Sequence, residues 1–382
     1  MKSIYLNHLA RAFILLAALL EFSAPAQSSA APVAMPRRPS IIFIQCDGLG
    51  YGDLSCYGQT KFQTPNIDQL AAEGIRFTNY SAAGASSPSQ AALLLGKNPA
   101  PLRQRADADI SLAADEITVA QVLKNSGYHT GLIGEWNLGD ENSSGVPWQQ
   151  GFDEFAGYLD HTGTNHFYAD YVFRYAPRNF LSATNDGPKS FVGREMIYRN
   201  TGGKKNEYIP DLLAQAALNF VKKNQPDPFN RHRPFFLLLN YEIPDGKIEV
   251  PTDAPFSEEA WPQPEKNRAA LISRLDGYVG GLREQLRKIG MTNNVVIFLS
   301  SSSGPKKTAE IDPAFFHSNI ASNDFRVPFI VHCPGKIPAG QISGAKVAPQ
   351  DFLPTAAAIA LTPAPTNIDG VSLLPELSGR EK

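Results

Sequence analysis

Polar side chains that could carry chemistry follow several short apolar runs of the sequence. Asp47 follows the apolar run at 40–45, a place where a metal or phosphate ligand often lies, and Glu135 and Asn137 follow the run at 129–133. A lone carboxylate is weak evidence of a site, because capping a nearby backbone amide is its commoner use. The seven histidines show no metal-ligand spacing such as H-x-x-x-H.

Serines form two further candidate groups. Ser86 opens the segment S-S-P-S before a helical run at 88–95, and the free N–H groups and dipole of such a helix start favour an anion. Ser86 could act there as a nucleophile, but a plain N-cap serine is commoner, and no histidine lies in a pattern that would activate it. The segment 300–303 is all serine and follows the run at 295–299, where a polar turn is the plain alternative.

The runs that carry these residues alternate between strand and helix patterns. Buried β-branched runs predict strands at 40–45, 75–80, 129–133, 235–241, 295–299 and 329–332. Amphipathic runs, several ending at glycine, predict helices at 66–73, 88–95, 119–125, 211–224, 267–289 and 351–361. This alternation predicts an α/β fold, a mostly parallel central sheet flanked by helices on both faces, with ligands beyond the carboxyl ends of the strands.

Two long stretches, 98–117 and 140–210, lack clear periodicity, and we expect them to be surface insertions. The second is rich in aromatic residues. Those rings could bind a sugar, although packing the insertion onto the body of the protein is their commoner use.

Composition excludes several classes of protein. Hydrophobic residues make up 43% and charged residues 19% of the 382 residues, which is typical of a soluble globular protein. The 35 Lys and Arg residues are balanced by 37 Asp and Glu residues, so no basic excess exists to bind nucleic acid. Three cysteines, Cys46, Cys56 and Cys333, cannot build a disulfide framework, and the sequence does not decide whether two of them pair.

The N-terminus has the pattern of a secretory signal peptide. Lys2 and Arg11 lie before an apolar run at 12–20, and Ala24-Pro25-Ala26 supplies a small-residue cleavage site. The run is too short for a membrane span, which needs about 20 apolar residues. We therefore expect a signal peptide at 1–26, a flexible tether at 27–38 and one domain at 39–380, secreted or released into the periplasm.

Ordered motifs between residues 39 and 378 resemble the sulfatase family, within the alkaline-phosphatase-like superfamily. The matching segments are L-G-Y-G-D at 49–53, T-P-N-I-D at 64–68, L-A-A-E-G at 70–74, P-S at 88–89, A-A-L-L at 91–94, G-F-D at 151–153, R-V-P-F at 326–329, P-G at 334–335 and D-G-V-S-L-L-P at 369–375. The resemblance implies the sulfatase fold and the hydrolysis of sulfate esters with Ca²⁺ and a formylglycine. Members commonly continue into a small C-terminal sheet subdomain, most of which we expect this chain to lack.

The positions to which the resemblance assigns catalysis are mostly replaced. The family's formylglycine, made from Cys or Ser, aligns with Ser86, but the arginine of its motif aligns with Gln90. The lysine and histidine of the family's G-K-W-H-L-G align with Glu135 and Asn137. Two further positions, a substrate-contacting histidine and a second lysine, align with Asp245 and His317.

The calcium positions change in the same way. Two adjacent aspartates of the family align with Asp47 and Gly48, and its later Asp and Asn ligands align with Ser302 and Ser303, so Asp47 alone is retained. The family pocket is net positive, whereas these positions here are net negative, so a sulfate ester should be repelled.

We therefore expect an exported pseudoenzyme with a binding or scaffold role, without metal or formylglycine. Its partner would be a carbohydrate or a protein, not a nucleic acid, and no membrane span would remain after signal cleavage. The alternative is a hydrolase of sulfate esters, acting on aryl or sugar sulfates, with reduced or altered chemistry.

Overall fold

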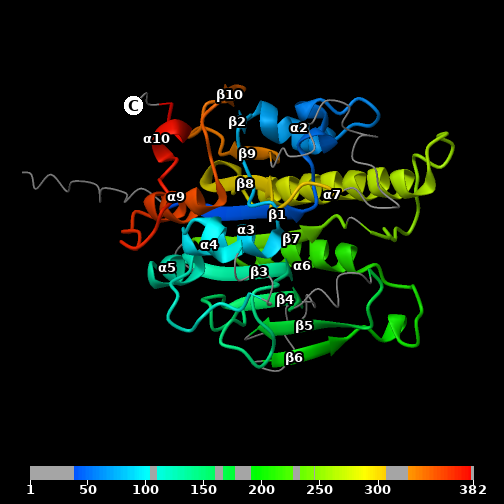
Figure 1. Cartoon of the computed structure of the whole chain (residues 1–382), viewed down its shortest axis with the longest axis horizontal. Helices are drawn as coiled ribbons and strands as arrows, with labels where there is room; N and C mark the ends of the chain where they lie inside the picture. Colours follow the sequence, from blue (N-terminus) through cyan, green and yellow to red (C-terminus); the bar gives the residue numbers. More distant parts are fainter. Residues whose placement is uncertain are drawn as a thin grey trace, which may run out of the picture. The chain divides into compact units, whose positions relative to one another are not determined.

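A computed structural model describes residues 38–103, 110–159, 167–176, 191–226, 233–244, 246–306 and 326–379. Within these ranges, ten strands form one sheet and helices pack along it (Figure 1). The strands are β1 (Ser40–Asp47), β2 (Ile75–Phe77), β3 (His129–Glu135), β4 (Glu154–Tyr158), β5 (Tyr171–Ala176), β6 (Phe191–Met196), β7 (Phe235–Glu242), β8 (Val295–Ser301), β9 (Phe329–His332) and β10 (Gln341–Ser343). The helices are α2 (Pro65–Ala72), α3 (Ser86–Leu95), α4 (Pro99–Arg103), α5 (Val119–Asn125), α6 (Ile209–Lys223), α7 (Gln263–Lys288), α9 (Phe352–Ile359) and α10 (Leu374–Leu377).

The centre of the sheet is parallel and its sides are mixed. The strand order is β10-β2-β9-β8-β1-β7-β3-β4-β5-β6, and the neighbours from β8 to β4 all run parallel. Antiparallel pairs join β9 to β8 and to β2 on one side, and β5 to β4 and to β6 on the other. The predicted α/β fold with a mostly parallel sheet is confirmed, and the carboxyl ends of the central strands meet at one edge.

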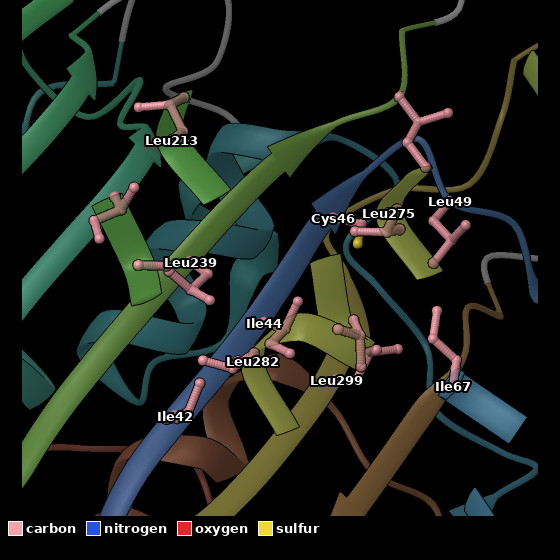
Figure 2. Packing of buried hydrophobic residues seen from close by; sticks show 14 of the residues in the cluster. Ile42, Ile44, Cys46, Leu49, Ile67, Leu213, Leu239, Leu275, Leu282 and Leu299 are labelled. Atoms are coloured by element: carbon pink, nitrogen blue, oxygen red, sulfur yellow. The ribbon is translucent and has the colours of Figure 1, made fainter. Parts of the chain in front are cut away.

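Helices cover both faces of the sheet, as the strand–helix alternation predicts. Alternate residues of β1 divide between two apolar clusters: Ile42 and Ile44 face helices α2, α6 and α7, whereas Ile41 and Phe43 face helices α3, α5 and α9. Figure 2 shows part of the first cluster, in which leucines of α6 and α7 pack on β1, β7 and β8. Each buried aliphatic side chain of this kind contributes about 1.5–3 kcal/mol to folding, so the two faces together hold the central strands in place.

The prediction that 140–210 is a surface insertion is wrong. This stretch contributes β4, β5 and β6, which extend the sheet beyond β3. Its aromatic rings are mostly packed: Tyr158, Phe167 and Phe173 are buried, and Tyr175 stacks on Trp148. Periodicity missed these strands because β4 lies in the sheet interior between β3 and β5, so both of its faces are covered and its residues do not alternate between apolar and polar.

Helix α3 begins earlier than the sequence predicts. It starts at Ser86, two positions before Pro88, and Ala85 is the N-cap without a side-chain hydrogen bond. Proline is compatible with the whole first turn, where backbone N–H groups have no helical partner, so it does not mark the first residue. The N-cap serine interpretation of Ser86 is therefore wrong, since Ser86 lies inside the first turn.

The remaining expectations concern the cysteines, a membrane span and the N-terminal segment. Cys46, Cys56 and Cys333 are free thiols. In the part of the chain that the structure describes, no helix is both long and apolar enough to cross a membrane. The expected signal peptide and nearly all of the expected tether fall outside the described residues.

Candidate active-site region

Four of the predicted site positions form one hydrogen-bonded cluster where β1 and β8 end. The Ser303 Oγ donates to Asp47 Oδ1 at 2.6 Å, and the Ser302 Oγ lies 3.1 Å from the same oxygen. The Ser302 Oγ also lies 3.1 Å from the Ser86 Oγ in the first turn of α3. The serine–aspartate cluster, as we call Asp47, Ser86, Ser302 and Ser303, is thus one carboxylate surrounded by neutral hydroxyls.

Strand pairing explains why these residues meet. β1 and β8 are adjacent and parallel, with Cys46 beside Ser301, so the residues that follow them leave the sheet side by side. The Ser302 backbone N–H and the Ser301 Oγ both donate to the Cys46 carbonyl, at 2.7 and 2.9 Å. The Ser301 Oγ in turn accepts from the Leu49 N–H at 3.1 Å. These bonds tie the serine segment to the loop after β1.

The backbone at Gly48 has a conformation that suits only glycine. Its φ is +83°, and a Cβ built on it would lie 2.1 Å from the Ile243 carbonyl oxygen. The Gly48 carbonyl accepts from Arg268 Nη2 at 2.7 Å, and the same nitrogen donates to Asp53 Oδ2 at 2.7 Å. Arg268 and Asp53 are 1% and 0% exposed, so a buried ion pair fixes this loop from the side of α7.

Gln90 lies in the second turn of α3, after Ser86, and is buried. Its Nε2 has no hydrogen-bond partner among the described residues. A guanidinium in the same place would bring a charge toward Ser86, whereas the amide brings none. Gln90 is therefore part of the same region as the serine–aspartate cluster but does not bond to it.

Glu135 and Asn137 form a second group at the end of β3. The side chain of Asn137 donates to Glu135 Oε1, and the Asn240 Nδ2 donates to the Glu135 backbone carbonyl at 2.7 Å. β7 separates β3 from β1 in the sheet, so the group is two strands away from Asp47. Asn137 has a φ of +56°, a left-handed conformation that asparagine tolerates better than most residues.

Asp245 and His317 lie outside the described residues, so their positions stay predictions. Within the described ranges, no group of three or more His, Cys, Asp or Glu side chains is placed to hold a metal ion. Burial, followed by the charges of Asp47 and Asp53, raises the pKa of the Cys46 thiol far above its usual value, so Cys46 stays protonated beneath the cluster.

Sequence reasoning missed other residues at this edge of the sheet. Glu242 ends β7 and is the strand partner of Asp47. Glu242, Asn240, Tyr158 and Glu135 line a cavity between the sheet and helices α6 and α7. The signal was available for Glu242, because it directly follows the predicted strand at 235–241 as Asp47 follows its own strand. For Asn240 no signal existed, since it lies within a strand, whereas Tyr158 is one of the aromatic residues of 140–210 that the sequence offers as possible sugar-binding rings.

Comparisons with known proteins agree with this fold. The family model named Sulfatase matches residues 39–361. Arylsulfatase A of Homo sapiens is 30% identical over 92% of this chain and 70% of its own length. The N-acetylgalactosamine-6-O-sulfatase of Bacteroides thetaiotaomicron is 30% identical over 79% of this chain and 68% of its own length.

Solved structures give the same result. The crystal structure of Ps i-CgsB in complex with k-i-k-neocarrahexaose superposes with a TM-score of 0.69 at 27% identity, covering 91% of this chain and 77% of that one. The family match over most of the chain, the two relatives and this structural likeness lead to one conclusion: the chain belongs to the sulfatase family.

Proposed function

We propose that this chain is an exported, non-catalytic member of the sulfatase family that binds a ligand or partner instead of hydrolysing a sulfate ester. The observation that carries the proposal is the backbone at Gly48. The second calcium aspartate of the family aligns there, yet the Ile243 carbonyl oxygen occupies the space that any Cβ would need. The loop has room only for glycine at this position. The difference from the family pattern therefore involves the path of the backbone as well as a side chain.

The residues present do not fit a calcium ion. Ca²⁺ takes six to eight oxygen ligands, usually with several carboxylates among them. The serine–aspartate cluster offers the carboxylate of Asp47, whose Oδ1 already accepts from Ser303 and Ser302, and neutral hydroxyls. Hydroxyls are weak replacements for the Asp and Asn ligands of the family. The proposed function therefore includes no step that uses a metal ion.

A nucleophilic role for Ser86 is equally unsupported. A serine hydroxyl needs a base or a modification to attack a sulfate ester. The hydrogen-bond partner of the Ser86 Oγ is the Ser302 hydroxyl, which is not a base. Glutamine at position 90 replaces the arginine of the formylglycine motif, and losing a single preorganised stabiliser typically lowers a rate about 10²–10³-fold.

The charge of the region disfavours an anionic substrate. Glu135 stands where the family has a lysine, Asp47 retains a carboxylate that the family pairs with calcium, and Asp245 adds a third carboxylate by sequence. One like-charge pair at about 4 Å costs roughly 4 kcal/mol at an effective dielectric constant of about 20. A sulfate ester would meet repulsion here instead of the attraction that binding requires.

A carbohydrate is the ligand that the neighbouring surface suits best. An open hollow beside β4 and β5 is lined by aromatic and polar side chains, which are Tyr158, Tyr168, Asp170, Tyr171, Asn200, Lys204, Lys205 and Glu249. Aromatic faces with nearby hydrogen-bonding groups are the usual lining of a sugar site. The complex of Ps i-CgsB with an oligosaccharide supports a saccharide as the ligand class, and a partner protein is the other candidate.

The alternative function is hydrolysis of sulfate esters, and it is favoured by the activity for which the relatives are named. The experiment that separates the two is a turnover screen with aryl and sugar sulfates. It uses purified protein, co-expressed with a formylglycine-generating enzyme and supplied with Ca²⁺, and intact-mass analysis reports whether Ser86 is oxidised. We expect unmodified Ser86 and no turnover above that of the Ser86→Ala variant.

Turnover that Ser86→Ala abolishes would refute the proposal and establish the alternative. Export has its own test, because it stands on the N-terminal pattern and not on the site. Fractionation followed by N-terminal sequencing should find the protein outside the cytoplasm, beginning near Gln27. Recovery of the full-length chain from the cytoplasm would contradict export while leaving the question of catalysis open to the turnover screen.

A further inference from the structure

The cavity between the sheet and helices α6 and α7 shares Tyr158 with the hollow beside β4 and β5, but the rest of its lining belongs neither to that hollow nor to the serine–aspartate cluster. It lies at the carboxyl ends of β3 and β7, which contribute Glu135, Asn240 and Glu242. The opposite wall is apolar and comes from the two helices, with Leu213 on α6 and Leu275 on α7. Figure 2 shows Leu213 near Leu239 of β7 and Leu275 near Cys46 of β1, both in the cluster on the face of the sheet that α6 and α7 cover.

Two buried polar atoms on this lining have no hydrogen-bond partner among the described residues. The Tyr158 hydroxyl is one, and the Asn240 Oδ1 is the other. Both residues are more than nine-tenths buried, at 7% and 8% exposed. The Asn240 Nδ2 donates to the Glu135 backbone carbonyl, so the Oδ1 is the end of the amide that can accept a hydrogen bond from a ligand. Buried polar atoms without a partner are rare and costly, and a ligand that bonds to them would remove the cost.

The chemistry of the lining calls for a ligand that donates hydrogen bonds and carries positive charge. Asn240 Oδ1 and the carboxylates of Glu135 and Glu242 can only accept hydrogen bonds, and the Tyr158 hydroxyl can also accept. Tyr241 and Tyr278 add aromatic rings, which attract cations over their faces. Burial, followed by the charge of Glu242, raises the pKa of Tyr158 well above its usual value, so the hydroxyl stays neutral.

The volume of the cavity limits which ligands can fit. The cavity has a volume of about 40 Å³, which is room for about three water-sized spheres. A sugar ring does not fit in this space, and a single metal ion would leave the apolar wall unused. We propose that this cavity binds a small primary ammonium group bearing a short alkyl chain, with the ammonium at Asn240, Tyr158 and the carboxylates and the alkyl chain against Leu213 and Leu275. The inference does not depend on whether the chain hydrolyses sulfate esters.

The test is a titration of the protein with ethylammonium chloride, followed through the methyl resonances of Leu213 and Leu275. Ethanol, which is nearly isosteric and neutral, and sodium chloride are the matched ligands. We expect saturable shifts with a Kd in the millimolar range or tighter for ethylammonium, and none for sodium chloride. Ethanol should bind at least about 10-fold more weakly, because it lacks the charge that the carboxylates attract.

Two variants assign the binding to the proposed groups. Tyr158→Phe should weaken ethylammonium binding about 3–10-fold without destabilising the fold, because the hydroxyl has no partner to lose. Glu242→Gln should weaken it about 10-fold or more. The control is Tyr128→Phe, which removes a hydroxyl bonded to the Pro39 carbonyl just before β3 and β1 begin, and it should leave the affinity unchanged.

Three results would overturn the proposal. One is the absence of any methyl shift with ethylammonium at concentrations that saturate a millimolar site. Another is equal affinity for ethanol, which would make the cavity a simple apolar hollow. The third is wild-type affinity in both variants, which would place the bound ammonium elsewhere. None of these results bears on turnover, so they leave the proposed non-catalytic function to its own test.

Discussion

Two neighbouring regions at the carboxyl end of β1 differ in what surrounds their carboxylate. In the first, Asp53 and Arg268 form a fully buried ion pair, and Asp53 also accepts from the Gly50 N–H at 2.6 Å. In the second, the serine–aspartate cluster surrounds Asp47 with neutral hydroxyls. The first region contains the family motif L-G-Y-G-D, and the second contains positions that the sequence aligns with the family's calcium ligands and nucleophile. Charge builds the loop in the first region, and the proposed departure from the family concerns the second.

The T-P-N-I-D motif has the same structural role as L-G-Y-G-D. Asp68 accepts from the Ser55 hydroxyl and the Cys56 N–H, at 2.5 and 2.8 Å. Asp276 of α7 accepts from the Ile67 N–H at 2.8 Å, which ties α2 to α7. Removing these carboxylates would leave buried donors unpaired. These motifs therefore identify the fold of the family, and they do not indicate whether the site is catalytic.

The largest effect should come from breaking the buried pair of the first region. Arg268→Ala leaves Asp53 charged in the interior and removes the donor to the Gly48 carbonyl, so we expect the free energy of unfolding to fall by about 3–5 kcal/mol. Urea unfolding measures it. The control is Arg274→Ala, whose partner Asp211 is partly exposed, with an expected cost of about 1 kcal/mol or less. Equal costs for the two variants would remove the distinction on which the comparison rests.

The next effect tests whether the loop after β1 is built around glycine. Gly48→Ala places a Cβ against the Ile243 carbonyl oxygen at a φ of +83°, and we expect it to cost about 2–4 kcal/mol in thermal or urea unfolding. Gly203→Ala is the matched control, because its φ of +77° is similar and nothing lies within 4 Å of its Cβ. Strain at that φ alone should cost about 1–2 kcal/mol. A Gly48→Ala variant as stable as Gly203→Ala would show that the loop can move aside and accept a side chain.

The central fold could be predicted from the sequence because its strands are short apolar runs between helices that end at glycines. β1, β3, β7 and β8 appear at or within two residues of their predicted bounds. The strands β4, β5 and β6 could not be predicted in the same way, although each pairs with the strand before it in the chain, because β4 is covered on both faces and its residues do not alternate between apolar and polar. The early start of α3 was hidden by Pro88, which the first helical turn accepts at more than one position.

The candidate site was predictable in part. The sequence places Asp47 and Ser302 after different strands, and only adjacency of β1 and β8 brings them within 3.1 Å. The resemblance identified the aligned positions, but it could not reveal the glycine-only backbone at Gly48, which depends on the Ile243 carbonyl directly after β7. The partner of Asp53 was also beyond reach, because Arg268 lies more than two hundred residues away in α7.

A third charged cluster lies at the opposite end of the sheet. Its charges have a structural role, as those of Asp53 and Arg268 do. Burial alone would lower the pKa of His129, but its bonds to Asp153 and Glu154, at 3.3 and 2.8 Å, outweigh burial and raise the pKa to about 9. The stabilisation is therefore complete below about pH 6.5, the unfolded value, and is lost as the pH rises through about 9.

A pH series of unfolding free energies tests this cluster. His129→Gln should cost about 1–3 kcal/mol in mildly acidic solution, and the difference from wild type should shrink as the pH rises above about 9. His332→Gln is the control, because burial lowers the pKa of His332, so that variant should not gain on the wild type in the alkaline range. A cost for His129→Gln that does not vary with pH would mean that the ring acts through packing on Phe220 alone.

The smallest effect should come from the serine–aspartate cluster itself. Ser303→Ala removes the donor to Asp47 Oδ1 and the acceptor of the Gly48 N–H, so we expect a cost of about 1 kcal/mol, and Ser257→Ala, at an exposed bond to Asp253, should cost less. The cluster is local, and Asp47 keeps a second donor in Ser302, whereas Arg268→Ala removes the guanidinium of a fully buried ion pair. A Ser303→Ala cost as large as that of Arg268→Ala would make the hydroxyls part of the framework. The replaced positions would then serve folding, and their departure from the family would need no change of function to explain it.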